Sequence, residues 1–406
     1  MHLDFWFDYS CPYAYAASGV IQETAARSGA TLRYRPFLLG GVFRALGTAQ
    51  NLALTLSPQK ALHTLHDQQR ALVRAGLPLD FPMAHPRRTV HALRATLAAY
   101  RRGDARPLVH ALFRAYWADQ QPIEEESFVR RLAAEHGFPE LDLEAEREPL
   151  RIETEAAIGL GVFGAPALVV HDDAGGAQLF WGHDRLDFVE AALGRPPAPA
   201  LIPLDPPSEA TLDFWFDYSS PFAFLASTQI RALGTRTGAK IRHRPFLLGA
   251  LFKAIGQVEV PLFAFSDAKR RWYLRDVMLH AERWGVPFQF SPHFPIRSVL
   301  ALRCTLAHPD PEPFIERVFH AAWVNGLDIG DAQVLKDLGG DPDAAPTQRE
   351  VLFAQTEEAA RTGVFGAPTI ILRQPGRAPQ RFWGQDRLGQ VEDVLRGWIA
   401  PGDLPE

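Results

Sequence analysis

Alternating apolar and polar positions predict the first elements of the chain. Residues 2–8, His-Leu-Asp-Phe-Trp-Phe-Asp, and residues 31–37 have the aromatic and apolar alternation of β-strands. Residues 14–27 lie between them and have a helical pattern, which a Cys-Pro pair introduces. Proline is favoured in the first turn of a helix, where its missing N–H costs nothing. The order strand, helix, strand predicts a parallel pair with a right-handed crossover.

About a hundred residues of mainly helical pattern follow, and then the α/β pattern returns. Helices are expected at residues 62–75, 89–102, 108–118 and 125–137. After the sequence Gly-Val-Phe-Gly-Ala-Pro, the pattern predicts a strand, a turn, a strand and a helix, at 167–171, 173–176, 178–181 and 187–193. We therefore expect an α/β domain that carries a helical insertion.

The whole pattern occurs twice. LDFWFDYSCPYAYAAS at 3–18 returns as LDFWFDYSSPFAFLAS at 212–227, and RPFLLG begins at both Arg35 and Arg244. The motifs GVFGAP and FWG(H/Q)DRL follow in both copies, at 161–166, 180–186, 363–368 and 382–388. Each copy is as large as a domain, so this is a duplication and not a solenoid repeat.

The repeat predicts the domain limits. Copy 1 is expected at residues 1–195, with its helical insertion at about 44–157, and copy 2 at 211–400, with its insertion at about 253–359. Residues 196–210 are rich in proline and are expected to form a semi-rigid linker. The order of elements in each copy is that of a thioredoxin-like domain. The predicted fold class is α/β, with two such domains that each carry a helical insertion.

Composition narrows the classes of function. The chain has 406 residues and a formal net charge of −5, without a basic block, which argues against a nucleic-acid partner. No segment is long and apolar enough to span a bilayer, and the first residues lack the features of a signal peptide. The two cysteines, Cys11 and Cys304, cannot make a disulfide framework. We expect a cytoplasmic protein with no membrane partner.

The first candidate for chemistry is the residue before the helix-starting proline, Ser220 in copy 2 and Cys11 in copy 1. The N-terminus of a helix favours anions, so a hydroxyl there can donate to a bound thiolate. A thiol there is expected to have a lowered pKa and to be nucleophilic. The alternatives are a simple N-cap for Ser220 and an inert, core-facing side chain for Cys11. Neither copy has the second cysteine of a C-x-x-C redox site.

Three further motifs are candidates for ligand binding. A cis proline in the Gly-Ala-Pro turn would leave the backbone of the preceding alanine free to pair with a peptide-like ligand, and an ordinary trans turn is the alternative. The acidic residue of the Trp-Gly-x-Asp segment could hold a ligand ammonium group or cap the next helix. A cation after RPFLLG could meet an anionic substrate or be a solvated surface charge. In copy 2 and then copy 1 these residues are Ala367, Pro368, Trp383, Gly384, Gln385, Asp386 and Lys253, and Ala165, Pro166, Trp181, Gly182, His183, Asp184 and Arg44.

Together the motifs resemble the 2-hydroxychromene-2-carboxylate isomerases, the kappa-class glutathione transferases and, more remotely, the DsbA-like oxidoreductases. DFWFDYSSPFAF, RPFLLGALFKAIG, KRRWYLRD, GVFGAPT and FWGQDRL appear in family order and cover nearly all of copy 2. Copy 1 matches at both ends, but its segment 58–67 lacks the basic and aromatic run of residues 269–276.

The resemblance implies glutathione as cofactor and assigns roles by position. Ser220 would hydrogen-bond and activate the glutathione thiolate, and Ala367, before a cis Pro368, would pair with the cysteinyl part. Residues 383–386 would hold the γ-glutamyl end and Lys253 would contact the substrate; Cys11, Ala165, residues 181–184 and Arg44 correspond in copy 1. No metal is implied. Family members commonly form homodimers, so the two copies are expected to pair within one chain.

The resemblance also implies a mechanism. Glutathione thiolate adds reversibly to a conjugated enone derived from an aromatic compound, the former double bond rotates, and the thiolate leaves. We expect this isomerase activity mainly in copy 2. Two alternatives stay open: a monothiol oxidoreductase or glutathione transferase that uses Cys11, and a non-catalytic binding protein.

Overall fold

The computed structural model describes residues 1–195, 203–205 and 207–402 of the chain, which divides into two compact units. The first unit consists of Met1–Thr55, Leu65–Pro199 and Ser266–Lys269, and the second of Leu56–Thr64, Ala200–Phe265 and Arg270–Glu406. Most of the expected linker, residues 196–202 and 206, lies outside the described residues.

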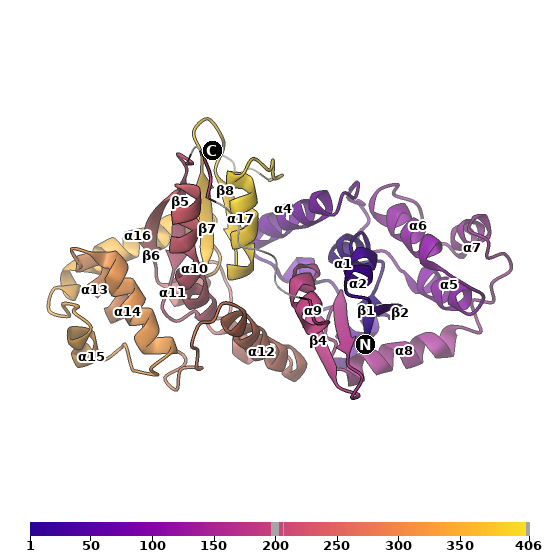
Figure 1. Ribbon diagram of the computed structural model, residues 1–406, viewed down its shortest axis with the longest axis horizontal. Helices are drawn as coiled ribbons and strands as arrows, with labels where there is room; N and C mark the ends of the chain where they lie inside the picture. The colour runs from indigo at the N-terminus through magenta and orange to yellow at the C-terminus, as the bar shows by residue number, and fades with distance from the viewer. Residues whose placement is uncertain (196–202, 206, 403–406) are drawn as a thin grey trace. The chain divides into compact units, whose positions relative to one another are not determined.

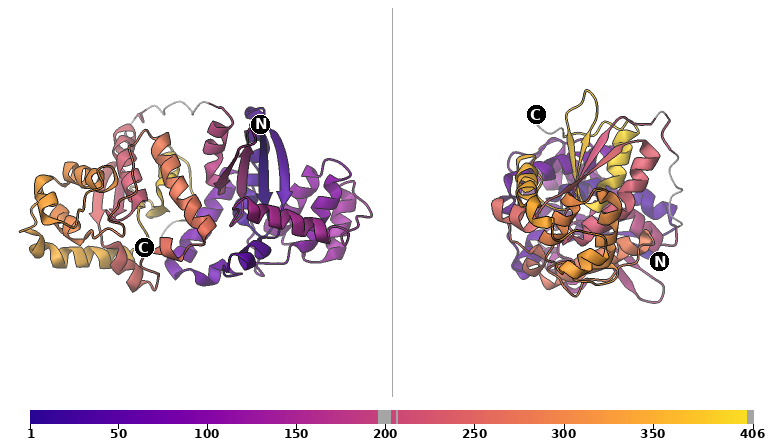
Figure 2. Two further views of the ribbon diagram at one scale, coloured as in Figure 1. Left: turned by 90° about the horizontal axis from the view of Figure 1, so that it is seen from below. Right: turned by 90° about the vertical axis from the view of Figure 1, so that its left-hand side faces the viewer.

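Each copy contains one mixed four-stranded sheet. Figures 1 and 2 show the strands among the helices of the two copies. In copy 1 the order is β2-β1-β3-β4, with β1 parallel to β2 and antiparallel to β3. Copy 2 repeats this topology in the order β6-β5-β7-β8. The strands are β1 (His2–Phe7), β2 (Thr31–Pro36), β3 (Ala167–His171), β4 (Ala177–Trp181), β5 (Thr211–Phe216), β6 (Lys240–Pro245), β7 (Thr369–Arg373) and β8 (Gln380–Trp383).

Helices cover the sheets and form the insertions between the second and third strands. Copy 1 has α1 (Pro12–Ser18), α2 (Ile21–Arg27), α3 (Leu39–Ala45), η1 (Leu52–Thr55), α4 (Pro58–Arg74), α5 (Val90–Tyr100), α6 (Arg106–Trp117), α7 (Glu126–Glu135), α8 (Arg147–Gly159), η2 (His183–Arg185) and α9 (Leu186–Ala192). Copy 2 has α10 (Pro221–Thr237), α11 (Leu248–Ala254), η3 (Pro261–Ala264), α12 (Asp267–Arg283), α13 (Val299–Ala307), α14 (Pro311–Trp323), α15 (Ala332–Asp337), η4 (Ala345–Gln348), α16 (Arg349–Arg361), η5 (Gln385–Arg387) and α17 (Leu388–Leu395). Across the described residues, no helix has both the length and the apolar character that crossing a bilayer requires.

The expected α/β order is confirmed, but the helix predicted at residues 14–27 is wrong in its continuity. In copy 1 it is divided into α1 and α2, whereas α10 runs unbroken through the equivalent segment. The break falls at Gly19, where copy 2 has Thr228. A Cβ on Gly19 would lie only 2.9 Å from Leu77 Cδ1, so close packing favours glycine there, and glycine weakens a helix interior.

Two helices of copy 1, α3 and α8, were not predicted. The α8 sequence, Arg-Glu-Pro-Leu-Arg-Ile-Glu-Thr-Glu-Ala-Ala-Ile-Gly, is dominated by charges, so its apolar periodicity is weak. The α3 sequence begins Leu-Gly-Gly, which has poor helix propensity. Both helices depend on contacts made in the folded protein: α8 packs on α3, and Thr154 Oγ1 accepts a hydrogen bond from the N–H of Leu38, just before α3.

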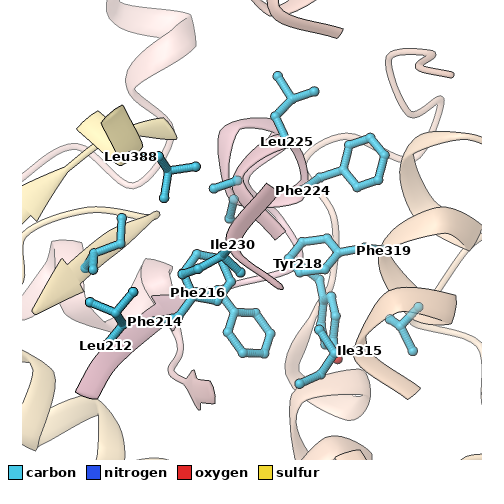
Figure 3. Close-up of a cluster of buried hydrophobic side chains, with 14 of the residues drawn as sticks. Leu212, Phe214, Phe216, Tyr218, Phe224, Leu225, Ile230, Ile315, Phe319 and Leu388 are labelled. Atoms are coloured by element: carbon cyan, nitrogen blue, oxygen red, sulfur yellow. The ribbon is translucent and has the colours of Figure 1, made fainter. Parts of the chain in front are cut away.

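The core of copy 2 lies between β5 and the helices that flank it. Figure 3 shows aromatic side chains at the end of β5 meeting Phe319 of α14. The ring centroids of Phe216 and Tyr218 lie 5.5 and 4.7 Å from that of Phe319. Trp323, also of α14, donates from Nε1 to the Tyr218 carbonyl at 2.8 Å, and the Tyr218 hydroxyl is 2.6 Å from Thr305 Oγ1 of α13. The helical insertion therefore holds the loop that follows β5.

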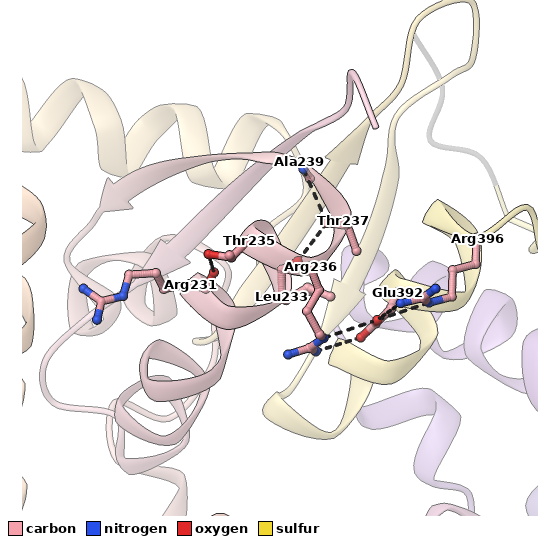
Figure 4. A network of polar contacts seen from close by, with 8 residues as sticks. All are labelled: Arg231, Leu233, Thr235, Arg236, Thr237, Ala239, Glu392 and Arg396. Atoms are coloured by element: carbon pink, nitrogen blue, oxygen red, sulfur yellow. Dashed lines mark hydrogen bonds and ion pairs between the residues drawn. The ribbon is translucent and has the colours of Figure 1, made fainter. Parts of the chain in front are cut away.

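An ion-pair network around a buried glutamate joins two helices, α10 and α17, that pack against each other. Glu392 of α17 binds Arg236 at the end of α10 at 2.8 Å and Arg396 at 2.7 Å (Figure 4). Burial opposes ionisation of Glu392, but its hydrogen bonds with the two arginines outweigh burial and hold its pKa below the usual value. The network ties the helix that starts at Ser220 to the helix that follows Asp386.

A buried carboxylate follows the first strand of each copy and organises the next loop. Asp217 accepts hydrogen bonds from the N–H of Ser219 at 2.9 Å and from the N–H of Leu248, the first residue of α11, at 2.8 Å. Its own carbonyl accepts from the N–H of Ser220 at 3.1 Å, and the Ser298 hydroxyl bonds the carboxylate from the start of α13. Burial raises the pKa of Asp217, although these hydrogen bonds oppose the shift. One side chain thus fixes three segments.

We predict that Asp217→Asn lowers the free energy of unfolding of copy 2 by about 1–3 kcal/mol, because one backbone N–H loses its acceptor in a buried site. The measurement is urea unfolding followed by tryptophan fluorescence. Asp331→Asn is the matched control: Asp331 caps α15 from an exposed position, accepting from Gln333 N at 2.7 Å, and asparagine is an equally good cap. Equal midpoints for the two variants would contradict the organising role of Asp217.

Candidate functional site

Ser220 is positioned at the start of α10 by local backbone geometry. It is the N-cap residue, with the extended φ and ψ of −98° and 116°, and Pro221 opens the helix. Its Oγ accepts a hydrogen bond from Ala223 N at 3.1 Å and donates to the Ala367 carbonyl at 2.9 Å. The N-cap alternative is therefore correct as a description of the local structure. The second bond goes beyond capping, because it joins the helix start to the Gly-Ala-Pro turn 147 residues later.

The peptide bonds Ala367–Pro368 and Ala165–Pro166 are both cis. The trans alternative is therefore wrong for both turns. Within the described part of the chain, the backbone N–H of Ala367 has no recorded hydrogen bond, while the Ala367 carbonyl receives the Ser220 hydroxyl. This backbone has the donor that a peptide-like ligand needs.

The Trp-Gly-Gln-Asp segment is joined to the same turn. Gly384 N donates to the Pro368 carbonyl at 3.0 Å, and the Trp383 indole covers Gly366, where a Cβ would lie 2.6 Å from Trp383 Nε1. Gly384 has φ of 110°, a conformation that side chains disfavour. Glycine is thus required at 366 and 384, which explains why the Gly-Ala-Pro and Trp-Gly-Gln-Asp motifs contain it. Figure 1 shows β7, β8 and α17, the elements around this segment, beside α10.

The expectation that Asp386 caps the following helix is wrong. Neither η5 nor α17 has a side-chain cap, and the residues in the cap positions are Gly384 and Arg387. The Asp386 carboxylate instead lies 3.2 Å from Arg387 Nη1, and 17% of the Asp386 side chain is exposed to solvent. Gln385, which precedes Asp386, is buried. The ligand-binding interpretation of Asp386 stays a prediction.

Lys253 is not brought to this cluster by any recorded contact among the described residues. It lies in the last turn of α11, with an exposed side chain, and Arg44 has the same place in α3. The position of α11 is nevertheless tied to Ser220 through Asp217, which binds the first N–H of α11. The substrate-binding roles of Lys253 and Arg44 stay predictions.

Copy 1 has the same backbone arrangement around a different atom. Cys11 Sγ donates to the Ala165 carbonyl at 3.0 Å, and Gly182 N donates to the Pro166 carbonyl at 3.0 Å. The Cys11 side chain makes no cap hydrogen bond, and its helix has only seven residues. The ring of His183 stacks on Tyr13 at 4.8 Å between centroids. Asp184 lies 3.0 Å from Arg185, as Asp386 does from its own arginine.

The expected lowering of the Cys11 pKa is wrong. Burial raises the pKa of Cys11 to about 12, since desolvation outweighs the favourable influence of the nearby backbone N–H groups of Tyr13 and Ala14 on a thiolate. The helix start alone pointed in the opposite direction, but it does not reveal how deeply the sulfur is buried. Cys304, expected to be an inert core residue, is fully buried in α13, and both cysteines are free.

Sequence reasoning missed Asp217 and its counterpart Asp8 as residues that shape the site. Asp8 binds the N–H groups of Ser10 and Leu39, both at 2.9 Å, and the Thr89 hydroxyl at 2.8 Å. The available signal was the identical Phe-Asp-Tyr-Ser sequence in both copies, where the strand alternation ends in an acid.

Comparisons with known proteins agree with this construction. The chain matches the family model of the DSBA-like thioredoxin domain twice, over residues 2–194 and 211–396. It is 30% identical over 201 residues to a 2-hydroxychromene-2-carboxylate isomerase of Sphingobium xenophagum. The aligned region covers 46% of this chain and 97% of that protein. A glutathione S-transferase kappa 1 of Caenorhabditis elegans is 28% identical, over 48% of this chain and 91% of the relative. Among solved structures, a 2-hydroxychromene-2-carboxylate isomerase is 29% identical, covers 48% of this chain and 95% of its own, and has a TM-score of 0.41.

These relatives are enzymes, which confirms the expectation of an enzyme. The double match confirms two thioredoxin-like domains, and the identities confirm the resemblance drawn from the motifs. The chain therefore belongs to the DsbA-like thioredoxin family, with the 2-hydroxychromene-2-carboxylate isomerases and kappa-class glutathione transferases, and it carries the family domain twice.

Proposed function

We propose that this protein is a glutathione-dependent isomerase that acts mainly through copy 2 on an enone derived from an aromatic compound. The observation that carries the proposal is the place of Ser220 Oγ, which lies at the start of the 17-residue helix α10 and 2.9 Å from the carbonyl of Ala367. A hydroxyl there can turn from the carbonyl to a bound sulfur and donate its proton. The relatives named as isomerases and glutathione transferases support the same class of chemistry.

Glutathione would be held by backbone and rim groups. The Ala367 N–H would donate to the cysteinyl part of the tripeptide. Ala367 lies directly before Pro368, and its carbonyl accepts the Ser220 hydroxyl. The Asp386 carboxylate, at the rim of the same cluster, would pair with the γ-glutamyl ammonium group. The positive end of α10 and the Ser220 hydroxyl would both favour the ionised sulfur.

The chemical step needs a thiolate and a conjugated carbonyl. The sulfur adds to the carbon–carbon double bond, and the displaced electron pair moves onto the carbonyl oxygen as an enolate. The former double bond is now single and rotates. Return of the electron pair expels the thiolate and restores the double bond in the other geometry, so glutathione is regenerated. Ser220 acts by keeping the leaving and attacking sulfur anionic near neutral pH.

We predict that Ser220→Ala lowers kcat for isomerisation of 2-hydroxychromene-2-carboxylate by about 10²–10³, because one donor to the reacting anion is removed. Glutathione binding, measured by calorimetry, should also weaken, because the Ser220 hydroxyl is one of the groups that hold the sulfur, so kcat is compared at saturating glutathione. The ultraviolet absorbance of bound thiolate should show a raised pKa for the glutathione sulfur. Ser227→Ala is the matched control on the same helix, since its hydroxyl bonds only the carbonyl of the preceding turn, that of Phe224.

If the parent binds glutathione and the thiol pKa of bound glutathione is the same in the parent and in Ser220→Ala, the role of Ser220 is contradicted. Parent protein that binds no glutathione would overturn the whole proposal and favour a non-catalytic binding protein. Binding without turnover of this substrate, together with conjugation of 1-chloro-2,4-dinitrobenzene, would move the function from isomerase to transferase.

Calorimetry should also find one glutathione per chain, because only copy 2 offers a hydroxyl at the helix start. In copy 1 the equivalent group is a buried thiol that donates to the Ala165 carbonyl, and the helix is shorter. Cys11→Ser restores the group of copy 2 and is the informative variant. Two glutathione molecules per parent chain, both lost in Ser220→Ala or neither, would contradict the assignment to copy 2.

The oxidoreductase alternative depends on thiolate at Cys11, and burial disfavours thiolate. With a pKa raised to about 12, fewer than about one Cys11 in a thousand is ionised at pH 8. We predict that iodoacetamide alkylation of Cys11, followed by peptide mass spectrometry, rises about tenfold per pH unit from pH 7 to 10 without a plateau. Free glutathione, whose thiol titrates within this range, provides the control. An alkylation rate of Cys11 that reaches a plateau below pH 9 would favour the oxidoreductase alternative.

A further inference from the structure

A second cluster of chemically active side chains lies at the opposite end of β1 from Cys11. His2 and Asp4 are two residues apart on this strand and therefore on one face. His171, the last residue of β3, is the cross-strand partner of His2. The two imidazole rings stack with centroids 4.2 Å apart and 12° between their planes. The cluster lies at the start of β1, close to the N-terminus marked in Figure 1.

The three side chains direct their ligand atoms toward one another. Asp4 Oδ2 lies 3.2 Å from His171 Nε2, and Asp4 Oδ1 lies 3.8 Å from His2 Nε2. One atom from each residue lies within 4.8 Å of the other two. Ligands 2.0–2.1 Å from a tetrahedral zinc ion are separated by about 3.3 Å, so small rotations of the two rings would suffice.

The carboxylate in this cluster lacks the partners that burial demands. Asp4 is only 3% exposed, and neither its Oδ1 nor His171 Nε2 has a hydrogen-bond partner among the described residues. A buried polar group that is left unpaired costs about 1–3 kcal/mol, and an unpaired charge costs more. Buried carboxylates are therefore paired with cations or bind metals. The neighbouring cation, Arg33, lies 3.2 Å from His2 Nε2 and has no recorded bond to Asp4.

Copy 2 shows how the same carboxylate is satisfied without a metal. Its counterpart Asp213 binds Arg242 Nε at 2.5 Å and Arg373 Nε at 2.8 Å. Burial opposes ionisation of Asp213, but the two arginines outweigh it and hold the pKa below the usual value. In copy 1, His171 stands in the place of Arg373, and His2 in the place of Thr211, which pairs with Arg373 across the strands. One of the two arginines is thus lost, two metal-binding side chains are gained, and Arg33, which stands in the place of Arg242, is directed to His2 and not to Asp4.

We propose that His2, Asp4 and His171 form a binding site for a divalent transition metal, with zinc as the ion that suits the donors. Two imidazoles and one carboxylate are a donor set that zinc favours, and three protein ligands leave a fourth position for water. The ion would supply the charge that Arg373 supplies in copy 2, and it would join β1 to β3. The site is separate from the proposed glutathione site, since the six residues of β1 span roughly 17–20 Å.

The surroundings set an expectation for affinity. Arg33 would have to leave His2 Nε2 when the ion binds, and its positive charge would repel the ion. The amino group of Met1 is already engaged by Asp173 at 2.6 Å. Arg33→Gln is therefore expected to tighten zinc binding, whereas loss of any of the three ligands is expected to weaken it.

The test is a titration of the full chain, made without a polyhistidine tag and freed of metal with a chelator, with zinc chloride in competition with a chromogenic chelator. We expect one zinc ion per chain. His171→Arg, which restores the residue of copy 2 and so preserves the pairing of Asp4, should weaken binding by about 100-fold or more because a ligand is replaced by a cation. His320→Ala, which removes an exposed histidine of α14, should change nothing. Cobalt should give the visible absorbance of a four-coordinate site in the parent alone.

A gain-of-site variant protects the test from misfolding of the loss variants. Thr211→His combined with Arg373→His places the same donors around Asp213 and should add a second zinc ion per chain. Zinc should also raise the melting temperature of the parent and not that of His171→Arg. A parent that binds no zinc, or whose zinc binding is unchanged in His171→Arg, would overturn the proposal. If His171→Arg is more stable than the parent and zinc does not raise the melting temperature of the parent, the cluster is only a place where copy 1 lacks an ion pair, and the proposal is overturned.

Discussion

The geometry of both sites at the helix starts depends on a carboxylate that the fold removes from water. Asp8 and Asp217 follow the first strand of each copy, and each accepts hydrogen bonds from two backbone N–H groups that no helix or sheet ladder satisfies. Through these bonds the end of the strand, the residue before the proline and the next helix are joined to one side chain. The side chains of the helical insertion complete the cage through Thr89 and Ser298. Without this carboxylate, neither the cap residue nor the helix that carries Lys253 would have a fixed place.

Within this common frame, the two copies differ by one atom at the N-cap position before the helix-starting proline. An oxygen at Ser220 caps its helix and reaches the Ala367 carbonyl, whereas the sulfur of Cys11 reaches Ala165 and caps nothing. A hydroxyl can stabilise another molecule's thiolate while staying neutral itself. A thiol acts as a nucleophile only when it ionises, and burial disfavours ionisation of Cys11. The two copies therefore share one backbone frame and present different side chains at the helix start.

The opposite end of the first strand shows a second divergence with the same logic. The buried acid is kept in both copies, but its compensation is different: two arginines hold Asp213, and two imidazoles surround Asp4. An arginine brings a permanent charge, whereas a histidine brings either a proton or a metal ion. Copy 1 has thus exchanged a closed ion pair for a site that can bind something from solution.

Local sequence patterns suffice to predict the duplication, the order of the strands, the two loops with glycine and proline, and the equivalence of Ser220 and Cys11. All of these are local patterns, because strand alternation, the proline at a helix start and the glycines beside Trp181 and Trp383 are written within a few residues. The break at Gly19, the contact of Ser220 with a carbonyl 147 residues away, the absence of an Asp386 cap and the direction of the Cys11 pKa follow only from the packed chain. The physical reason is that burial and long-range register are properties of the packed chain. A helix start lowers the pKa of a thiol that is exposed to water, whereas burial in a core raises it. His2 contacts His171 only because β1 and β3 are paired in that register.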